Sequence, residues 1–293
     1  MNKLIGFLRL TRPANIVTAV ADILAGISIA GFFGLSEFDL HDVWYLILST
    51  VGLYGGGVVF NDVFDADLDR VERPERPIPS GLISEGEAST LASILLIIGI
   101  TFAFAVSLLS GFIAVSIAIA AVVYDKWGKH HPFLGPVNMG FCRGLNLLLG
   151  VSIIPHQVEQ YWPVGFVPLV YIAAITMVSR GEVHGGSKRT LLSAGVLYAL
   201  AVCTILVVGI RNQHLLWPLL LVGAWAFMIF VPLFKAIQNP QGRFIGRAVK
   251  AGVIALILMN AAWAAAFGFP VTALIIISLL PVSVLLARIF AVT

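Results

Sequence analysis

The sequence predicts an all-α integral membrane protein, a bundle of nine to ten transmembrane helices around a central apolar chamber. Composition is the first reason: 59% of the 293 residues are hydrophobic, only 11% are charged, and the mean hydropathy is +0.98. Apolar runs of about 20 residues, long enough to cross a bilayer, recur along the chain. Because a helix of that length satisfies its own backbone hydrogen bonds in lipid, we expect each run to span the membrane.

The runs follow one another with short connections, so we expect one transmembrane domain over residues 1–293. The first run is longer than the core of a signal peptide and is expected to be retained as a span. The expected spans, in order, are Ala14–Gly34, Val43–Val63, Ala88–Leu109, Gly111–Tyr124, Leu134–Ile154, Pro163–Ser179, Leu191–Ile210, Leu215–Phe234, Arg247–Gly268 and Val271–Arg288.

The basic residues are distributed unequally between the two sides of the predicted bundle. Ten spans place both termini on one side, and that side holds nearly every lysine and arginine, whereas the other side holds Arg211 and Arg143 lies within a span. This asymmetry indicates a cytoplasmic basic side, and we expect a bacterial inner-membrane location with both termini and the site loops in the cytoplasm. Topology explains the positive charge, so we expect membrane lipid and no nucleic acid as a partner. The residues on the basic side are Lys3, Arg9, Arg12, Arg70, Arg73, Arg76, Lys126, Lys129, Arg180, Lys188, Arg189, Lys235, Arg243, Arg247, Lys250 and Arg288.

An unusually acidic stretch, NDVFDADLDRVERPERPIPSG, follows the second span at residues 61–81. Asn61, Asp65 and Asp69 stand at i, i+4 and i+8, which places them on one face of a helix, and Asp62 precedes Asp69 by about two turns. Like charges stacked in this way repel one another without a counter-charge. Oxygen ligands from Asp and Asn suit Mg²⁺, which shares its coordination shell with substrate phosphates.

Arginines follow these acids in a proline-rich loop, and guanidinium groups bind phosphate oxygens through charge-assisted hydrogen bonds. Arg70, Arg73 and Arg76 therefore predict, together with the acids, a metal bridged to a diphosphate at the membrane face. The alternative is a solvated loop that only sets the membrane topology.

The stretch resembles the first aspartate-rich motif of the UbiA superfamily of membrane prenyltransferases. Two flanking segments, RLTRPANIVTA and YDKWGKHHPFLGPVNMGFCRGL, resemble the same family. The family has nine helices, so the last span would be an addition. The residues that carry the motif are Asn61, Asp65, Asp69, Arg76, Pro77, Pro79, Ser80 and Gly81.

The resemblance implies Mg²⁺-dependent transfer of an isoprenyl group from an isoprenyl diphosphate to an unknown small-molecule acceptor. Asp65, Asp69 and Glu182 would then be catalytic, and Lys129 and Tyr124 would contact the donor. Ionisation of the allylic diphosphate needs a leaving group stabilised by metal and a dry chamber that protects the carbocation.

The family's second aspartate-rich motif is altered in this chain, where the corresponding segment reads SRGEVHGGSKRT. Ser179 and Gly186 replace two of its aspartates, and Glu182 is the one carboxylate left. One interpretation is that Glu182 still binds metal, while His184 and Lys188 contact the diphosphate directly. The other is that the protein binds an isoprenoid without turning it over.

The same segment resembles the EboC-like branch of the superfamily. That resemblance implies a non-aromatic, cyclitol-like acceptor. His184 has a further interpretation as a loop histidine without a catalytic role, because imidazole is a poor ligand for Mg²⁺.

Polar residues also lie within the predicted spans, where they usually face the interior of a bundle. Asp22 is predicted to orient an acceptor hydroxyl or accept its proton, and Arg143 to hold phosphate. The alternative is that Asp22 and Arg143 form an internal ion pair that holds helices together. Asn260 is expected to form an interhelical hydrogen bond.

Two other functions remain open. A secondary transporter would use the intramembrane charges Asp22 and Arg143 and the acid cluster as a permeation path. A non-catalytic isoprenoid-binding protein would bind the donor without releasing pyrophosphate.

Overall fold

The computed structural model describes residues 2–128, 131, 133–182 and 185–290, and the described residues form helices and loops without a strand. Each of the ten predicted spans corresponds to a long helix. The α-helices are α1 Lys3–Thr11, α2 Pro13–Ile29, α3 Leu40–Phe64, α4 Ala66–Glu72, α5 Glu85–Val106, α6 Leu108–Val123, α7 Leu134–Val151, α8 Pro155–Tyr161, α9 Phe166–Ser179, α10 Lys188–Arg211, α11 Leu216–Gln238, α12 Gly242–Ala266 and α13 Pro270–Ile289; shorter turns are η1 Phe32–Gly34, η2 Tyr124–Gly128 and η3 Trp162–Gly165.

Eight of the described helices are long and apolar enough to cross a membrane, and a ninth span results if α1 and α2 are counted together. Helix α7 is not among them because Asn138, Arg143 and Asn146 lower its hydropathy, yet it packs within the bundle against α2 and α9. The prediction of a helical integral membrane protein with nine to ten helices is confirmed.

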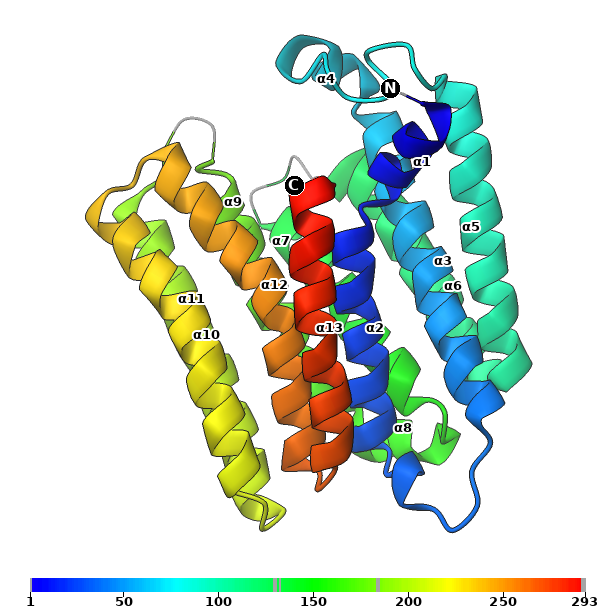
Figure 1. The fold of residues 1–293 in the computed structure, drawn as a ribbon, viewed down its shortest axis with the longest axis vertical. Helices are drawn as coiled ribbons and strands as arrows, with labels where there is room; N and C mark the ends of the chain where they lie inside the picture. The colour runs from blue at the N-terminus through cyan, green and yellow to red at the C-terminus, as the bar shows by residue number, and fades with distance from the viewer. Residues whose placement is uncertain (1, 129–130, 132, 183–184, 291–293) are drawn as a thin grey trace.

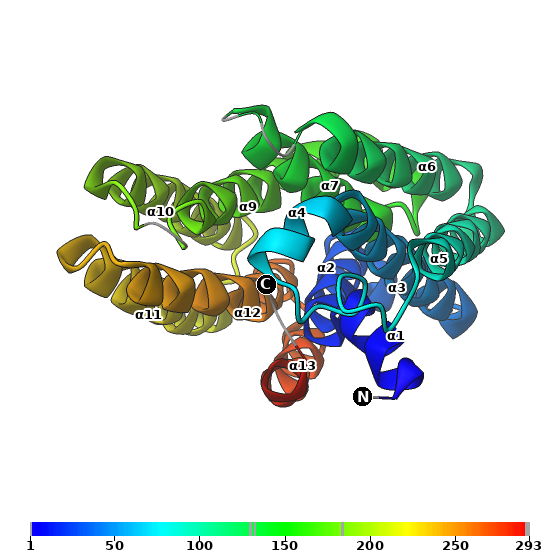
Figure 2. The same ribbon diagram turned by 90° about the horizontal axis from the view of Figure 1, so that it is seen from above.

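Both termini lie at the same end of the bundle, which is also the end that carries α4 (Figure 1). Figure 2 looks onto this end and shows α4 above the middle of the bundle, with α2 surrounded by other helices. Helix α12 is the most buried candidate span, with 83% of its apolar window inside the protein. We call this end, which carries both termini, the loop end.

Glycines allow the closest helix pairs to approach. A Cβ atom added to Gly52 of α3 would stand 2.5 Å from the Leu95 carbonyl oxygen of α5, and one added to Gly26 of α2 would stand 2.3 Å from the Leu147 carbonyl oxygen of α7. Small residues drive helix association in lipid because they bring backbones into van der Waals contact. These contacts hold α2, α3, α5 and α7 together beneath the acid-rich stretch.

Candidate active site

The acid-rich stretch begins in α3 and continues through a break into α4. Helix α3 ends at Phe64, and Asp65 has a backbone outside the regular helical region, with φ −93° and ψ 0°. Helical hydrogen bonds nevertheless cross the break: the Asp65 amide donates to the Asn61 carbonyl (3.0 Å), and the Asp69 amide donates to the Asp65 carbonyl (2.8 Å). The three residues, which we call the ladder, therefore stay on successive turns as their spacing predicts.

The Asn61 end of the ladder faces helix α6. The Asn61 amide donates to Asp125 Oδ1 at 2.8 Å, and Asp125 is 3% exposed in the π-helical turn η2. The sequence analysis missed Asp125, although a carboxylate beside Tyr124 at the end of an apolar helix was a usable signal. The charges of Asp65 and Arg180 also act on the Tyr124 phenol, so the first motif, η2 and the altered second segment meet here.

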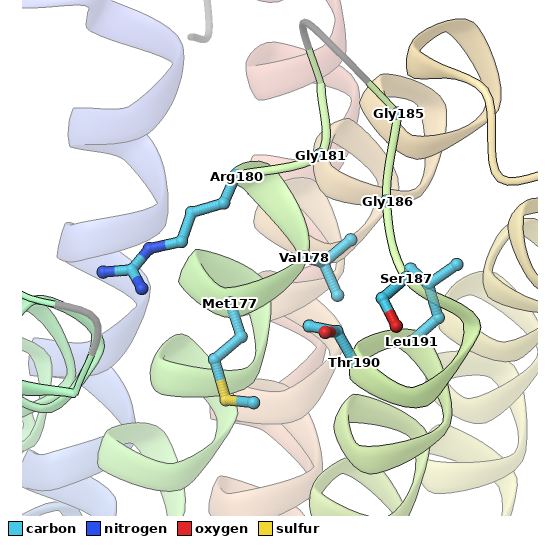
Figure 3. Close-up of a pocket in the computed structure, with 9 residues that line it drawn as sticks. All are labelled: Met177, Val178, Arg180, Gly181, Gly185, Gly186, Ser187, Thr190 and Leu191. Carbon is cyan, nitrogen blue, oxygen red and sulfur yellow. The ribbon is translucent and has the colours of Figure 1, made fainter.

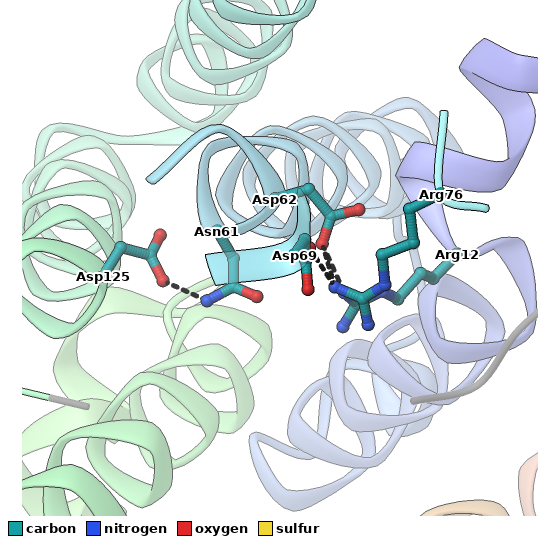
Figure 4. A network of polar contacts seen from close by, with 6 residues as sticks. All are labelled: Arg12, Asn61, Asp62, Asp69, Arg76 and Asp125. Carbon is teal, nitrogen blue, oxygen red and sulfur yellow. Dashed lines mark hydrogen bonds and ion pairs between the residues drawn. The ribbon is translucent and has the colours of Figure 1, made fainter. Parts of the chain in front are cut away.

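The other acids of the stretch face arginines. Arg12 donates to Asp62 at 2.5 Å, and Arg76 contacts both Asp69 (2.7 Å) and Asp62 (3.5 Å). Figure 4 shows Asp62 and Asp69 turned toward Arg76, whereas Asn61 points the opposite way toward Asp125. All four of these charged side chains are at most 16% exposed, so the pairs are shielded from solvent and are stronger than surface ion pairs.

Glu182, in the altered second segment, approaches the loop of the first motif. Burial raises the pKa of the Glu182 carboxyl, and the nearby positive charge of Arg73 opposes that rise. Glu182 and Arg73 are therefore close enough for their charges to interact, whereas a single site shared by the two segments stays a prediction. Lys188 begins helix α10 and is exposed. The predicted residues Lys129 and His184 lie outside the described residues.

A cavity of about 300 Å³ lies beside this segment, between the end of α9 and the start of α10 (Figure 3). Gly181, Gly185, Gly186 and Ser187 line one side, and Ser187 caps α10 by accepting from the Arg189 amide. Figure 3 shows the Arg180 side chain extending away from Ser187. This glycine-rich segment leaves room for a ligand, and the described residues that line the cavity include no carboxylate.

The ladder offers the kind of oxygen donors that hold Mg²⁺. Asn61, Asp65 and Asp69 supply one amide and two carboxylates on successive turns, which suit a hard cation better than sulfur or imidazole ligands. Within the described ranges, no group of three His, Cys, Asp or Glu side chains converges as a ready-made metal site. The ligand roles of these residues, and of Asp62 and Glu182, stay predictions.

Asp22 and Arg143 lie inside the bundle and pair with each other. Arg143 Nε is 2.5 Å from Asp22 Oδ2, and Asn146 and Asn260 donate to the same carboxylate at 3.0 and 2.6 Å. Asp22 is fully buried. The structure thus forms the internal ion pair that the sequence left as an alternative, and the interhelical hydrogen bond of Asn260 is confirmed.

Roles of Asp22 and Arg143 toward a substrate stay predictions. The network also includes Thr18, which accepts from Arg143 at 2.9 Å, and Thr50, which donates to Asn146 at 2.7 Å. It joins α2, α3, α7 and α12. The two cavities that we describe lie at the loop end, so the central apolar chamber also stays a prediction.

The chain is similar to known proteins over most of its length. The model of the UbiA prenyltransferase family matches residues 23–243. Digeranylgeranylglyceryl phosphate synthase of Ignicoccus hospitalis is 28% identical over 243 residues, covering 79% of this chain and 78% of the relative. The protein of the same name from Methanothermobacter thermautotrophicus is 31% identical over 185 residues, covering 62% of each chain and thus less than two thirds of that relative.

Solved structures share the fold. The apo structure of a UbiA homolog from Aeropyrum pernix K1 has a TM-score of 0.70 at 16% identity, covering 84% of this chain and 96% of the homolog. A digeranylgeranylglyceryl phosphate synthase has a TM-score of 0.68 at 24% identity, covering 91% and 99%. A UbiA homolog from Archaeoglobus fulgidus bound to DMAPP and Mg²⁺ has a TM-score of 0.62 at 19% identity, covering 89% and 98%.

Proposed function

This chain belongs to the UbiA prenyltransferase family, and on that premise we propose that it transfers an isoprenyl group from an isoprenyl diphosphate to a small acceptor within the membrane. The observation that carries the proposal is the ladder of Asn61, Asp65 and Asp69, held on successive turns at the basic end of an apolar bundle. The resemblance drawn from the sequence motifs is confirmed at the level of the family.

Donor binding is proposed to use the basic residues around the ladder. Arg73, Arg76 and Lys188 would hold diphosphate oxygens, because guanidinium and ammonium groups form strong charge-assisted hydrogen bonds with phosphate. Tyr124 would add a contact from η2. Lys129 and His184 complete the proposed set, by the resemblance alone.

Magnesium, when bound, would be held by Asn61, Asp65 and Asp69, with Asp62 and Glu182 as further candidates, and would stabilise the departing diphosphate as a Lewis acid. The homolog from Archaeoglobus fulgidus, by its name, binds both DMAPP and Mg²⁺. This supports the same pairing of diphosphate and metal in the present chain.

Arg76 has two roles in this proposal. In the structure it neutralises Asp69 and Asp62, which lets these acids lie close together without repulsion. When donor binds, the same guanidinium would turn to the diphosphate, while the carboxylate of Asp69 becomes available as a ligand. The allylic C–O bond would then break, diphosphate would leave with the bonding electrons, and an acceptor hydroxyl would attack the allylic carbon and pass its proton to the released diphosphate.

Two kinds of acceptor are supported by different observations. The altered second segment with Glu182 resembles the EboC-like branch and favours a cyclitol-like acceptor. The names of the relatives contain a glyceryl phosphate, which favours a phosphorylated glycerol lipid. Supplying each acceptor separately with labelled donor, and identifying the lipid product by mass, distinguishes the two.

We also propose how the protein is oriented in the membrane. The basic residues gather at the loop end, and the positive-inside rule favours a cytoplasmic position for it. The bacterial inner membrane stays a prediction.

Release of pyrophosphate tests the proposal against its alternatives. Purified protein with geranyl, farnesyl or geranylgeranyl diphosphate, Mg²⁺ and a lysate as acceptor source should release pyrophosphate only when Mg²⁺ is present. Solute uptake without pyrophosphate release would instead indicate a transporter. Donor binding without release, even with lysate, would indicate a non-catalytic isoprenoid-binding protein.

A further inference from the structure

Asp125 is a buried carboxylate beside the ladder that the proposed function does not use. It lies in η2, the π-helical turn at the end of α6, and is 3% exposed. The turn packs against α3 and α7, and π-helical turns are rare and occur mostly at functional sites. It brings Asp125 to Asn61 of the ladder, which lies 64 residues earlier in the chain.

The contact fixes which end of the Asn61 amide faces Asp125. Asn61 Nδ2 donates to Asp125 Oδ1 at 2.8 Å, a length typical of a hydrogen bond to an ionised group. An ionised carboxylate accepts hydrogen bonds and cannot donate them, so it selects the nitrogen end of an amide. Figure 4 shows the nitrogen of Asn61 turned to Asp125 and its oxygen turned the other way.

The two ends of an amide differ as metal ligands. Mg²⁺ takes oxygen ligands, whereas an amide NH₂ group donates hydrogen bonds and carries its partial positive charge toward a cation. Because the two ends are nearly equal in size, packing alone does not distinguish one orientation from the other. A hydroxyl in the place of Asp125 could donate as well as accept, so it would permit both orientations. A carboxylate permits only the orientation that leaves the oxygen for a metal.

Another carboxylate orients an asparagine in the same way inside the bundle. Asn146 Nδ2 donates to the Asp22 carboxylate at 3.0 Å, and the Asn146 oxygen accepts from the Thr50 hydroxyl at 2.7 Å. The carboxylate holds the nitrogen end, and the oxygen end therefore faces a different partner. Asn61 repeats the first half of this arrangement, and its oxygen end is the one that the proposed function assigns to Mg²⁺.

The acids of the first motif are oriented from the opposite side. Arg76 contacts Asp69 at 2.7 Å, and Arg12 contacts Asp62 at 2.5 Å. Arg12, Asp62 and Arg76 line a second cavity at the loop end, which has a volume of about 590 Å³. Cations thus orient the carboxylates on one side, and a carboxylate orients the amide on the other.

We infer that Asp125 is a positioning residue that keeps the oxygen of Asn61 directed at the Mg²⁺ site. The inference rests on the proposed function for the metal, whereas the hydrogen bond stands on the structure itself. Asp125 acts through Asn61 and not through a contact of its own with metal or substrate. Partners that hold metal ligands in place in this way typically contribute about 10- to 100-fold to metal affinity.

The Mg²⁺ affinity of the full-length protein in nanodiscs is the first test. Mg²⁺ is titrated calorimetrically in the presence of a thio-analogue of geranylgeranyl diphosphate that does not ionise. Asp125→Asn should weaken Mg²⁺ binding about tenfold, because an amide at position 125 can donate as well as accept and lets the Asn61 amide turn. The matched control is Asp67→Asn, which removes a carboxylate of α4 that is 94% exposed and should leave the affinity unchanged.

Exchanging the two side chains should restore the affinity. When Asn61→Asp and Asp125→Asn are combined, the amide at position 125 donates to the carboxylate at position 61, which presents oxygen to the metal in either orientation. The exchange changes neither the net charge nor the number of non-hydrogen atoms, so Mg²⁺ should bind about as tightly as in the wild type. Asn61→Asp alone places two carboxylates at hydrogen-bond distance and should lower the thermal stability of the metal-free protein.

The orientation of the Asn61 amide can be observed by nuclear magnetic resonance of protein labelled with ¹⁵N at its asparagines. The side-chain NH₂ signal of Asn61 is assigned through its loss in Asn61→Asp. In the Mg²⁺-bound wild type, the hydrogen bond to Asp125 should shift one of the two NH₂ protons, and Asp125→Asn should remove most of that shift. A general attraction between the Asp125 charge and the cation would leave this signal unchanged.

Three results would overturn the inference. Unchanged Mg²⁺ affinity in Asp125→Asn, whatever its thermal stability, would reduce the hydrogen bond to a contact between helices. Weakened Mg²⁺ affinity with an unchanged Asn61 signal would assign the effect to the charge of Asp125 alone. An exchanged pair that binds Mg²⁺ no better than Asp125→Asn would show that the pair does not act by orienting an oxygen.

The wild-type protein tests the proposed function separately. If it binds no Mg²⁺ even with the thio-analogue, the metal role of the ladder fails, and the proposed function fails with it. If it binds Mg²⁺ and releases pyrophosphate while Asp125→Asn changes neither, only the positioning role is refuted. Mg²⁺ binding that depends on Asp125, in a protein that never releases pyrophosphate, would support the positioning role and refute prenyl transfer.

Discussion

The contacts of Asp22 allow the effect of removing its charge on the free energy of unfolding to be predicted. Asp22 is fully buried, and its carboxylate is shared by Arg143, Asn146 and Asn260 from two other helices. Asp22→Asn keeps the size of the side chain and one oxygen acceptor but leaves the Arg143 guanidinium without its counter-charge. The variant therefore tests the contribution of the ion pair to stability while leaving the side-chain packing unchanged.

The expected loss follows from the partners. Removing one member of a buried ion pair costs about 3–5 kcal/mol, because the remaining charge is left uncompensated in a low dielectric. The amide hydrogen bonds of Asn146 and Asn260 add little, since such bonds between membrane helices average about 0.6 kcal/mol. Arg143 also keeps its contact with Thr18. We therefore expect Asp22→Asn to lower the free energy of unfolding by about 3 kcal/mol.

A double-mutant cycle with Arg143→Met measures the pair itself. The double variant buries no charge at these two positions, so it should be less destabilised than the sum of the single variants, by about 2 kcal/mol. The assay is reversible unfolding of detergent-solubilised protein in a denaturant titration, followed by circular dichroism. If the losses of unfolding free energy in the two single variants instead add up in the double variant, with a coupling energy below about 0.5 kcal/mol, the reasoning is refuted. That result would favour a substrate role for Asp22.

Other variants test the ladder, the altered segment and the helix packing. Asp65→Asn and Asp69→Asn should each reduce pyrophosphate release by about 100-fold or more with unchanged helical content, and wild-type activity in both would contradict the ladder. Glu182→Gln should raise the Mg²⁺ concentration for half-maximal activity, whereas an unchanged titration would assign metal binding elsewhere. Gly52→Ala should destabilise the protein by about 1–3 kcal/mol, since its Cβ would meet a carbonyl oxygen, while Gly86→Ala, with open space around it, should not; equal effects would contradict the close approach.

The fold was predictable because its signals are local. A run of apolar residues specifies a spanning helix whatever surrounds it, so every predicted span has its helix. The ends were less predictable: the span expected to end at Gly34 ends as α2 at Ile29, where a left-handed Gly31 and the turn η1 follow. Such ends depend on capping and turn geometry, which hydropathy does not report.

The site was predictable in its chemistry but not in its pairing. The spacing of Asn61, Asp65 and Asp69 predicts one face, and backbone hydrogen bonds keep the three residues on successive turns across the break at Asp65. The side chains of Asn61 and Asp69 nevertheless point to opposite partners, Asp125 and Arg76. Arg70, Arg73 and Arg76 were expected to bind phosphate, yet in the structure Arg70 and Arg76 contact the carboxylates of Glu85 and Asp69. Which anion an arginine binds depends on what the fold brings near it, and spacing along the chain does not show that.

The amino-acid sequence alone determined the membrane class, the helices and the oxygen ladder, since each depends on residues within a few turns of one another. Only the tertiary structure decided that Arg12 meets Asp62, 50 residues away, and that Asn260 meets Asp22, 238 residues away. The physical reason is burial: the packing of distant helices removes these groups from water, and a buried charge must then find its partner across the fold.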